Sequence, residues 1–326
     1  MAPVARILIR TAVTLAAAGL LAHEPGFLGL GQETRFQAAE ARGWQSATLP
    51  RVPFDAKQML DDVKALSADD MEGRKTGTPG NARARAYIVE RFKASGIQPF
   101  GQSYTTEFST GGVTGANVVG RVAGTRQPAR YIVVSAHYDH LGIVRGRIFN
   151  GADDNASGTA ALFALGAYFS AHRPRHGIIF AAFDAEEGSL GGARAFVRTP
   201  PVLLSAMALN LNADMIGRDA TNRLFVSGTY QQPALKPYVE RVARRAPVRL
   251  LMGYDDPKSG QDNWVPRSDQ WPFIQAGVPG LYIGVEDYEH YHQPSDDYDT
   301  LTHIFYVNAV ETLRLLVEEF DAGLGT

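Results

Sequence analysis

Five short segments of the sequence concentrate the side chains that bind divalent metal ions in proteins. They are H-Y-D-H-L-G at 137–142, G-A-D-D-N-A-S-G at 151–158, D-A-E-E-G-S-L-G-G at 184–192, N-A-D-M-I-G at 212–217 and E-H-Y-H-Q-P-S-D at 289–296. The chain has no cysteine, so a metal site would use imidazole and carboxylate ligands alone. Carboxylates crowded into one place repel one another unless a cation neutralises them. This set of residues favours a site for two divalent ions, if the fold brings the segments together.

Each segment also has an ordinary structural explanation when it is considered alone. Asp153 or Asp154 can cap a helix that starts near Ala156, and Asp214 can begin a turn. A pair of glutamates usually lies on the solvated surface, and a single histidine near a strand end is usually a hydrogen-bonded structural residue. The occurrence of all five segments in one chain favours the metal site over these separate explanations.

The remaining pattern of the chain predicts a fold that would place the segments side by side. From residue 129 onward, apolar strand-like runs alternate with helical patterns, which is typical of a mostly parallel sheet with helices on both faces. We predict a single α/β domain with ligands beyond the carboxyl ends of the strands. The predicted strands are 103–108, 116–122, 131–136, 177–183, 207–213, 223–227 and 280–285, and the predicted helices are 55–68, 78–95, 156–169, 193–197, 233–244 and 304–321.

The segment that follows the strand at 131–136 adds a geometric argument. Residues two apart on a strand point to the same side. A metal-bound imidazole usually donates its second N–H to a carboxylate or a carbonyl group. The H-Y-D spacing therefore predicts a ligand, His137, beside an orienting partner, Asp139.

Charge and composition exclude several classes of function. The net charge is -2 and there is no long basic run, so the sequence lacks the positive patch that nucleic-acid binding requires. No G-x-G-x-x-G follows the first strong strand, which argues against a dinucleotide enzyme. The absence of cysteine excludes a thiol nucleophile and a disulfide framework.

The N-terminus resembles a secretory signal. Arg6 and Arg10 precede an apolar stretch, Thr11 to Ala22, which is shorter than the roughly 20 residues of a membrane span. We expect export to the periplasm or the medium, with cleavage near Ala22 or Ala41 and no stable membrane span after processing. An uncleaved anchor or an ordinary apolar helix is the alternative. The expected parts are a signal-like segment at 1–22, a loose lead-in at 23–54 and the main domain at 55–326.

The five segments, in this order and at these distances, resemble the di-zinc exopeptidases typified by bacterial leucyl aminopeptidase and aminopeptidase S. A further stretch, L-S-A-D-D-M-E-G-R-K-T-G-T-P-G at 66–80, is similar to the lead-in of secreted bacterial members. The resemblance covers roughly residues 55–320. It implies the zinc-exopeptidase fold, which is phosphorylase/hydrolase-like, and two zinc ions, for which cobalt or manganese are possible substitutes.

The resemblance assigns roles to individual residues where the spacing alone left alternatives open. It selects Asp154 rather than Asp153 as the carboxylate that bridges both ions, and His292 rather than His290 as the last ligand. The implied metal ligands are His137, Asp154, Glu187, Asp214 and His292. Each ion would have two terminal ligands and the shared carboxylate, which leaves room for a bridging water, as expected of a catalytic site.

Two further residues are implied to act in catalysis. Glu186 would be the general base that takes a proton from the zinc-activated water and passes it to the leaving amine. Asp139 would orient His137. The two ions would lower the pKa of Glu186, whereas burial would raise it. The implied reaction is hydrolysis of the N-terminal peptide bond in peptides that have a free N-terminus.

The chain departs from the family pattern at residues 268–270. They read S-D-Q where relatives often have S-D-H, so Gln270 and Trp271 are expected to reshape the substrate pocket without touching the metals. The loop at 251–264 is the expected wall of that pocket. Tyr254 and Trp264 would either line this wall or anchor the loop.

Other activities remain open on the same fold. A glutaminyl cyclase would keep much of the ligand set but work with one zinc ion, so metal stoichiometry distinguishes it from a two-zinc peptidase. Carboxypeptidase or dipeptidase specificity is a second alternative. A non-catalytic binding protein is a third, and it is disfavoured because every implied ligand is present. Failure to bind any divalent ion would favour the binding protein.

Overall fold

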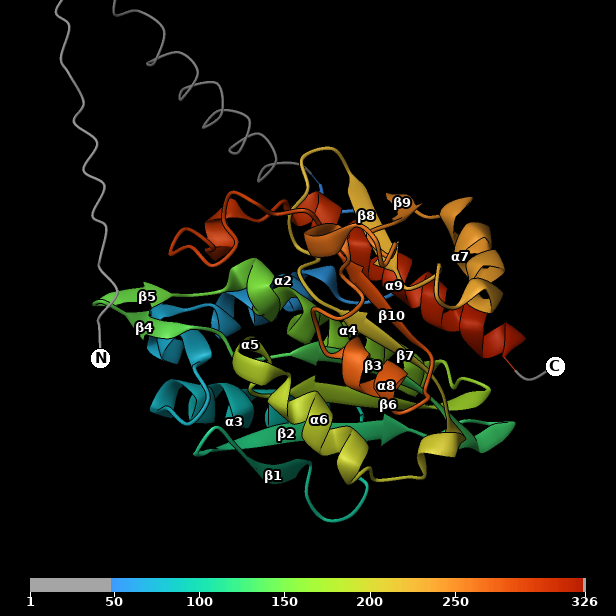
Figure 1. Cartoon of the computed structure of the whole chain (residues 1–326), viewed down its shortest axis with the longest axis horizontal. Coiled ribbons are helices and arrows are strands. Elements are labelled where there is room, and N and C mark those ends of the chain that lie inside the picture. Colours follow the sequence, from blue (N-terminus) through green and yellow to red (C-terminus); the bar gives the residue numbers. More distant parts are fainter. Residues whose placement is uncertain (1–47, 325–326) are drawn as a thin grey trace, which may run out of the picture. The chain divides into compact units, whose positions relative to one another are not determined.

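The computed structural model describes residues 48–324, and its central feature is an eight-stranded β-sheet (Figure 1). Across the sheet the strands follow the order β1-β2-β6-β3-β7-β10-β8-β9. Their bounds are β1 Thr105–Thr110, β2 Val113–Val122, β3 Gln127–His137, β6 His176–Phe183, β7 Met207–Ala213, β8 Arg223–Ser227, β9 Arg249–Met252 and β10 Gly280–Gly284. A separate hairpin pairs β4, Gly142–Val144, with β5, Arg147–Phe149.

The four central strands, β6, β3, β7 and β10, run parallel to one another. Towards one edge, β2 and then β1 are added antiparallel, and towards the other edge β8 runs antiparallel to β10 and parallel to β9. The predicted fold class, a mostly parallel sheet in one α/β domain, is confirmed. Because the central strands are parallel, their carboxyl ends meet at one edge, where ligands collect in such sheets.

The first two of the described helices begin at capping side chains. Their bounds are α2 Ala56–Leu66, α3 Pro79–Ala94, α4 Gly158–Ala171, α5 Glu186–Ser189, α6 Gly191–Arg198, α7 Lys236–Ala243, α8 Gln270–Gln275 and α9 His303–Gly323. At α2 the Asp55 carboxylate accepts a hydrogen bond from the N–H of Gln58 at 2.9 Å. At α3 the Thr78 hydroxyl caps the helix and Pro79 occupies its first position.

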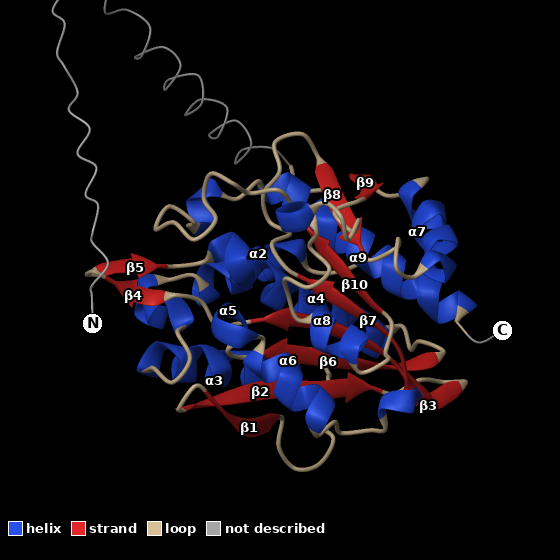
Figure 2. Cartoon of the chain, viewed as in Figure 1, coloured by secondary structure: helices blue, strands red, loops and turns tan. Residues whose placement is uncertain are grey.

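Helices cover both faces of the sheet, and successive residues of each central strand alternate between the two faces. In β3, Ile132 and Val134 belong to the larger core, while Tyr131 and Val133 belong to the smaller one. The larger core includes side chains of α2, α3, α4, α7 and α9, and the smaller includes those of α6 and α8, which lie on the near side in Figure 2. Burial on both faces explains why these strands read as continuous apolar runs.

Some elements differ from the sequence prediction. The helix predicted to start at Ala156 begins at Gly158, because the chain at Ala152–Ser157 forms an irregular turn. In this turn Asn155, not an aspartate, accepts a hydrogen bond from the N–H of Gly158 at 2.9 Å. The sequence does not predict β4, β5, β9, α5 or α8, because these elements are only three to six residues long and carry no readable periodicity.

The signal-like segment and its two candidate cleavage sites fall within residues 1–47, which lie outside the described residues. The predicted division of the chain at residues 22 and 54 therefore stays a prediction. Between residues 48 and 324, no helix combines the length and the apolar character that crossing a membrane requires.

Candidate metal centre

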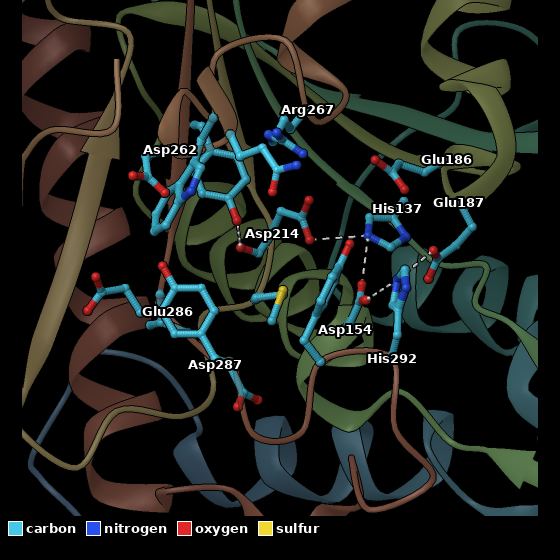
Figure 3. Close-up of a pocket in the computed structure, with 17 residues that line it drawn as sticks. His137, Asp154, Glu186, Glu187, Asp214, Asp262, Arg267, Glu286, Asp287 and His292 are labelled. Atoms are coloured by element: carbon cyan, nitrogen blue, oxygen red, sulfur yellow. Dashed lines mark hydrogen bonds and ion pairs between the residues drawn. The ribbon is translucent and has the colours of Figure 1, made fainter. Parts of the chain in front are cut away.

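The predicted site residues converge at the carboxyl ends of the four parallel strands (Figure 3). His137 is the last residue of β3, and Asp214 directly follows β7. The paired glutamates open the short helix α5 after β6, and His292 lies in the loop after β10. Asp154 comes from the irregular turn before α4. Segments far apart in the sequence thus contribute to one place.

Asp154 lies between two groups of ligand atoms. Its Oδ1 atom is 3.2 Å from Nε2 of His137, which is also 3.2 Å from Oδ1 of Asp214. Its Oδ2 atom is 3.3 Å from Nε2 of His292, which is 2.9 Å from Oε2 of Glu187. Two ligands of a tetrahedral zinc ion, with bonds of about 2.0–2.2 Å, lie roughly 3.3 Å apart. Both groups fit zinc, and one carboxylate takes part in each.

The charges in the site favour bound cations. Burial lowers the pKa of His137, but the carboxylates of Asp214 and Glu186 outweigh it and raise that pKa well above its usual value. Burial also lowers the pKa of His292, yet hydrogen bonds to Asp154 and Glu187 raise it to about 10. The excess of negative charge that holds protons on these imidazoles also attracts divalent cations, which would replace the protons.

The spacing left Asp153 and His290 open as alternative ligands, and both contact partners outside the two ligand groups. Asp153 is fully buried, and its Oδ1 atom accepts a hydrogen bond from the N–H of Gly217 at 2.6 Å. His290 places its Nδ1 atom 3.0 Å from the hydroxyl of Ser295. The geometry brings together the five residues that the family resemblance implies and leaves Asp153 and His290 outside. That the five bind metal stays a prediction.

Asp139 contacts more than the histidine that it is predicted to orient. The Nδ1 atom of His137 is 3.1 Å from the backbone oxygen of Asp139 and 3.7 Å from its carboxylate. The same carboxylate accepts hydrogen bonds from the N–H groups of Glu186, at 3.0 Å, and Glu187, at 3.4 Å. Asp139 therefore connects the end of β3 to the start of α5, and its carbonyl is the nearer partner of the imidazole.

Glu186 lines the same pocket but belongs to neither ligand group. The pocket has a volume of about 300 Å³. Burial raises the pKa of Glu186 well above its usual value; His137 opposes this shift, and the carboxylates of Asp214 and Asp269 increase it. A carboxyl group that readily holds a proton beside the ligand atoms suits a general acid–base role.

The wall of the pocket includes Trp264, at the end of the predicted loop. Tyr254 is not among the lining residues; it stacks on Trp264 with ring centres 3.8 Å apart and planes 4° from parallel. Trp264 also meets the ring of Tyr282 edge-on, and the Tyr282 hydroxyl donates to the backbone oxygen of Asp214 at 2.9 Å. Trp264 is thus the lining residue, and Tyr254 anchors it.

Gln270, which stands where relatives often have histidine, is buried behind this wall. Its Nε2 atom donates to the backbone oxygens of Trp264, at 3.1 Å, and Val265, at 2.8 Å. Its Oε1 atom accepts from the side chain of Asn212 in β7 at 3.1 Å. Neither Gln270 nor Trp271 lines the pocket, so Gln270 acts on it only by holding the loop.

Arg74 was assigned no role by the sequence, yet it is fully buried beneath the ligand-bearing loops. Its guanidinium donates to the backbone oxygens of Leu66, Tyr138, Asn150 and Gly151 at 2.6–2.9 Å. These bonds join the upstream stretch to the H-Y-D-H segment and to the turn before Asp154. Burial lowers the pKa of Arg74 to about 10, against the pull of nearby carboxylates, so the group is charged at neutral pH. In the sequence, the family-like stretch at 66–80 was the signal that could have pointed to a role for Arg74.

Two other acids of the five segments support the site without facing the pocket. Asp184 is buried and accepts hydrogen bonds from the hydroxyl of Thr76 at 2.8 Å and from the side chain of Asn81 at 2.9 Å. The carboxylate of Asp296 accepts from the N–H groups of Asp153 and Asp154 at 2.9 and 3.0 Å. Asp296 therefore ties the loop that carries His292 to the turn that carries Asp154.

Solved structures of zinc aminopeptidases and glutaminyl cyclases share this fold. BSAP, a zinc aminopeptidase from Bacillus subtilis, superposes with a TM-score of 0.68 over 84% of this chain and 96% of its own, at 15% identity. The glutaminyl cyclase of Porphyromonas gingivalis superposes with a TM-score of 0.67 over 82% of this chain and 98% of its own, at 18% identity. At these identities the likeness concerns the fold.

The sequence itself assigns the family. Residues 117–317 match peptidase family M28, and the chain belongs to this family, which confirms the resemblance drawn from the motifs. A probable zinc metalloprotease from Pyrenophora teres f. teres is 31% identical over 194 residues, which cover 54% of this chain and 40% of that protein. The chain spans 40–48% of the length of the first curated relatives that it matches.

Proposed function

We propose that this chain is an exported zinc-dependent aminopeptidase that removes the N-terminal residue from peptides with a free N-terminus. The observation that carries the proposal is the pair of ligand groups that share Asp154, with Glu186 unligated in the same pocket. The two groups would hold two zinc ions, His137 and Asp214 facing one and His292 and Glu187 facing the other.

The chemistry follows from these positions. Zinc ions bound there would supply Lewis acidity toward the scissile carbonyl group and toward water. Glu186 would accept a proton from water at its carboxylate and deliver the proton to the leaving amine. Asp139 would keep His137 and the start of α5 in register through the contacts described above.

The acidic lining supports a substrate with a free amino terminus. Beyond the ligand groups, the pocket is lined by Asp262, Glu286 and Asp287. Glu286 and Asp287 are paired with arginines, whereas Asp262 makes no ion pair within residues 48–324. An ammonium group would find an acceptor in Asp262, and Arg267 is the arginine that lines the same pocket.

A glutaminyl cyclase is the second candidate, because the cyclase of Porphyromonas gingivalis matches the fold about as well as BSAP does. We would incubate zinc-loaded protein with peptides that have free, acetylated or glutamine N-termini, and with free or amidated C-termini. Mass spectrometry should show loss of N-terminal residues from all peptides with free N-termini. Loss of ammonia from the glutamine peptides alone would establish the cyclase, and loss from the C-terminus would establish a carboxypeptidase.

Replacement of Glu186 tests the mechanism directly. Glu186→Ala should lower turnover by about 10²–10⁴-fold, because proton transfer is lost, while the zinc content stays that of the wild type. Turnover and metal content would be measured on the same preparations. Glu90→Ala, which changes an exposed glutamate of α3, provides the matched control and should leave both unchanged. Full activity of Glu186→Ala would remove Glu186 from the mechanism.

Export rests on the positively charged start and the apolar stretch that follows it. Expression of the full chain and sequencing of the mature N-terminus would test it. A mature protein that begins after Ala22 or Ala41 supports export with cleavage, and an intact N-terminus in the membrane fraction supports an anchor.

A further inference from the structure

We propose that His140 is a positioning residue for the second zinc site: it donates a hydrogen bond from Nδ1 to Oε1 of Glu187, so that Oε2 alone faces the ion. The inference rests on the proposed two-zinc function and concerns a residue to which neither the sequence nor the family resemblance gives a role. His137, the first residue of H-Y-D-H, would bind one zinc ion, and His140, the fourth, would orient a ligand of the other.

The contact between the two side chains is short and buried. Nδ1 of His140 is 2.5 Å from Oε1 of Glu187, and the imidazole has no exposed surface. The other carboxylate oxygen of Glu187 is 2.9 Å from Nε2 of His292, on the pocket side in Figure 3. Each oxygen of Glu187 therefore has its own imidazole partner.

The distances separate a ligand from a hydrogen-bond partner. The ligand atoms of His140, Asp154 and Glu187 lie close enough to surround a cation. However, Nδ1 of His140 is 3.7 Å from Oδ2 of Asp154 and only 2.5 Å from Glu187, whereas two ligands on one zinc ion are roughly 3.3 Å apart. His292, at 3.3 and 2.9 Å from the same two residues, fits the ion better. His140 fits a direct hydrogen bond to Glu187.

The surroundings of the ring favour the same assignment. Nε2 of His140 is buried without a hydrogen-bond partner. With the proton on Nδ1, this unpartnered atom is a neutral acceptor; with zinc on Nδ1, it would be a buried N–H donor without an acceptor, which is the costlier arrangement. Gly151, at a φ of +57°, packs against the ring so closely that a Cβ atom there would lie 2.6 Å from it. The ring is thus held in one orientation.

A matched pair of variants tests the proposal. Asparagine and leucine have similar shapes, and an asparagine amide can donate where Nδ1 of the histidine does. We would measure the zinc affinity of each site against a competing chelator, and the visible absorption of the cobalt-substituted protein, for wild type, His140→Asn and His140→Leu. His140→Ala adds a donor-free variant without steric demand, and exposed His172→Ala is the control.

The expected result is a loss confined to one site. His140→Leu and His140→Ala should weaken one of the two zinc sites by about 10–100-fold and leave the other unchanged, and His140→Asn should restore most of the loss. Unchanged affinity in both donor-free variants would overturn the proposal. A second result would also overturn the proposal: His140→Asn loses zinc as strongly as His140→Leu and His140→Ala do, and the spectrum of its cobalt-substituted form shows one nitrogen ligand fewer. A wild-type protein that binds two zinc ions but does not cleave peptides would refute the proposed function alone.

Discussion

Histidines face carboxylates at both ends of the central strands, with different results. At the amino end of β6, Nδ1 of His176 is 3.0 Å from Oδ1 of Asp321 in α9. At the carboxyl end of β3, Nε2 of His137 is 3.2 Å from Asp154 and from Asp214. Within residues 48–324, both groups that could hold a metal ion lie at the carboxyl ends, although the amino end uses the same residue types.

The two ends of the strands differ in the other hydrogen bonds that their carboxylates accept. Asp321 accepts hydrogen bonds from the N–H groups of His176, at 2.7 Å, and Arg175, at 2.8 Å, so backbone amides occupy its oxygens. At the other end, Asp154, Glu187 and Asp214 meet in one pocket. The comparison teaches that a surplus of carboxylates over N–H donors, beside open space, marks a candidate metal site. A histidine–aspartate pair by itself does not.

The largest effect is expected where both ligand groups depend on one residue. Asp154→Asn keeps the side-chain size but removes the charge shared by the two groups, so zinc affinity should fall by at least about 100-fold at both sites, and peptide cleavage with it. Metal analysis after dialysis against a chelator would measure this loss. One zinc ion retained at the wild-type affinity would show that Asp154 does not bridge.

An intermediate effect, on stability rather than on metal binding, is expected at the amino end of β6. Asp321→Ala would leave two backbone amides and an imidazole without their acceptor, so the free energy of unfolding should fall by about 1–3 kcal/mol. Urea denaturation would measure this change, and the zinc content of the folded protein should not change. If Asp321→Ala lost zinc, the distinction drawn between the two ends would be wrong.

The smallest effect is expected at Glu319, which pairs with two partly exposed arginines near the same end. Hydrogen bonds from Arg241, at 2.6 Å, and Arg245, at 2.9 Å, hold the pKa of Glu319 below its usual range. A lowered pKa means that the carboxylate stabilises the folded state above about pH 4.3 and that this contribution disappears as the pH falls further. Glu319→Gln should therefore cost at most about 1 kcal/mol at pH 7 and less at pH 3. Denaturation at both values checks this; an equal loss at pH 3 would contradict it.

The fold and the cluster of site residues were predictable because both depend on patterns within short segments. The run at 131–136 is apolar on both faces, as it is in β3, and acids follow each central strand in the sequence itself. The choice between Asp153 and Asp154 needed the family resemblance. The structure then separated the two residues by their partners.

The residues missed by sequence reasoning act through contacts that depend on the path of the loops. His140 meets Glu187 because the ends of β3 and β6 are adjacent, and the sequence contains no spacing that reports this. Gln270 reads as a pocket residue, but its side chain turns toward Asn212 behind the wall. Arg74 lies in a recognisable stretch, yet three of its four backbone acceptors, Tyr138, Asn150 and Gly151, lie far from it in the sequence.

The buried guanidinium of Arg74 has a consequence for the life of the protein before it acquires metal. Small zinc domains such as zinc fingers are unfolded until the ion arrives, because nothing else assembles their ligands. Here a permanent internal cation already joins the loops around Asp154 and offsets part of their negative charge. The metal-free chain is therefore expected to fold with the loops around Asp154 already joined, before it binds its ions.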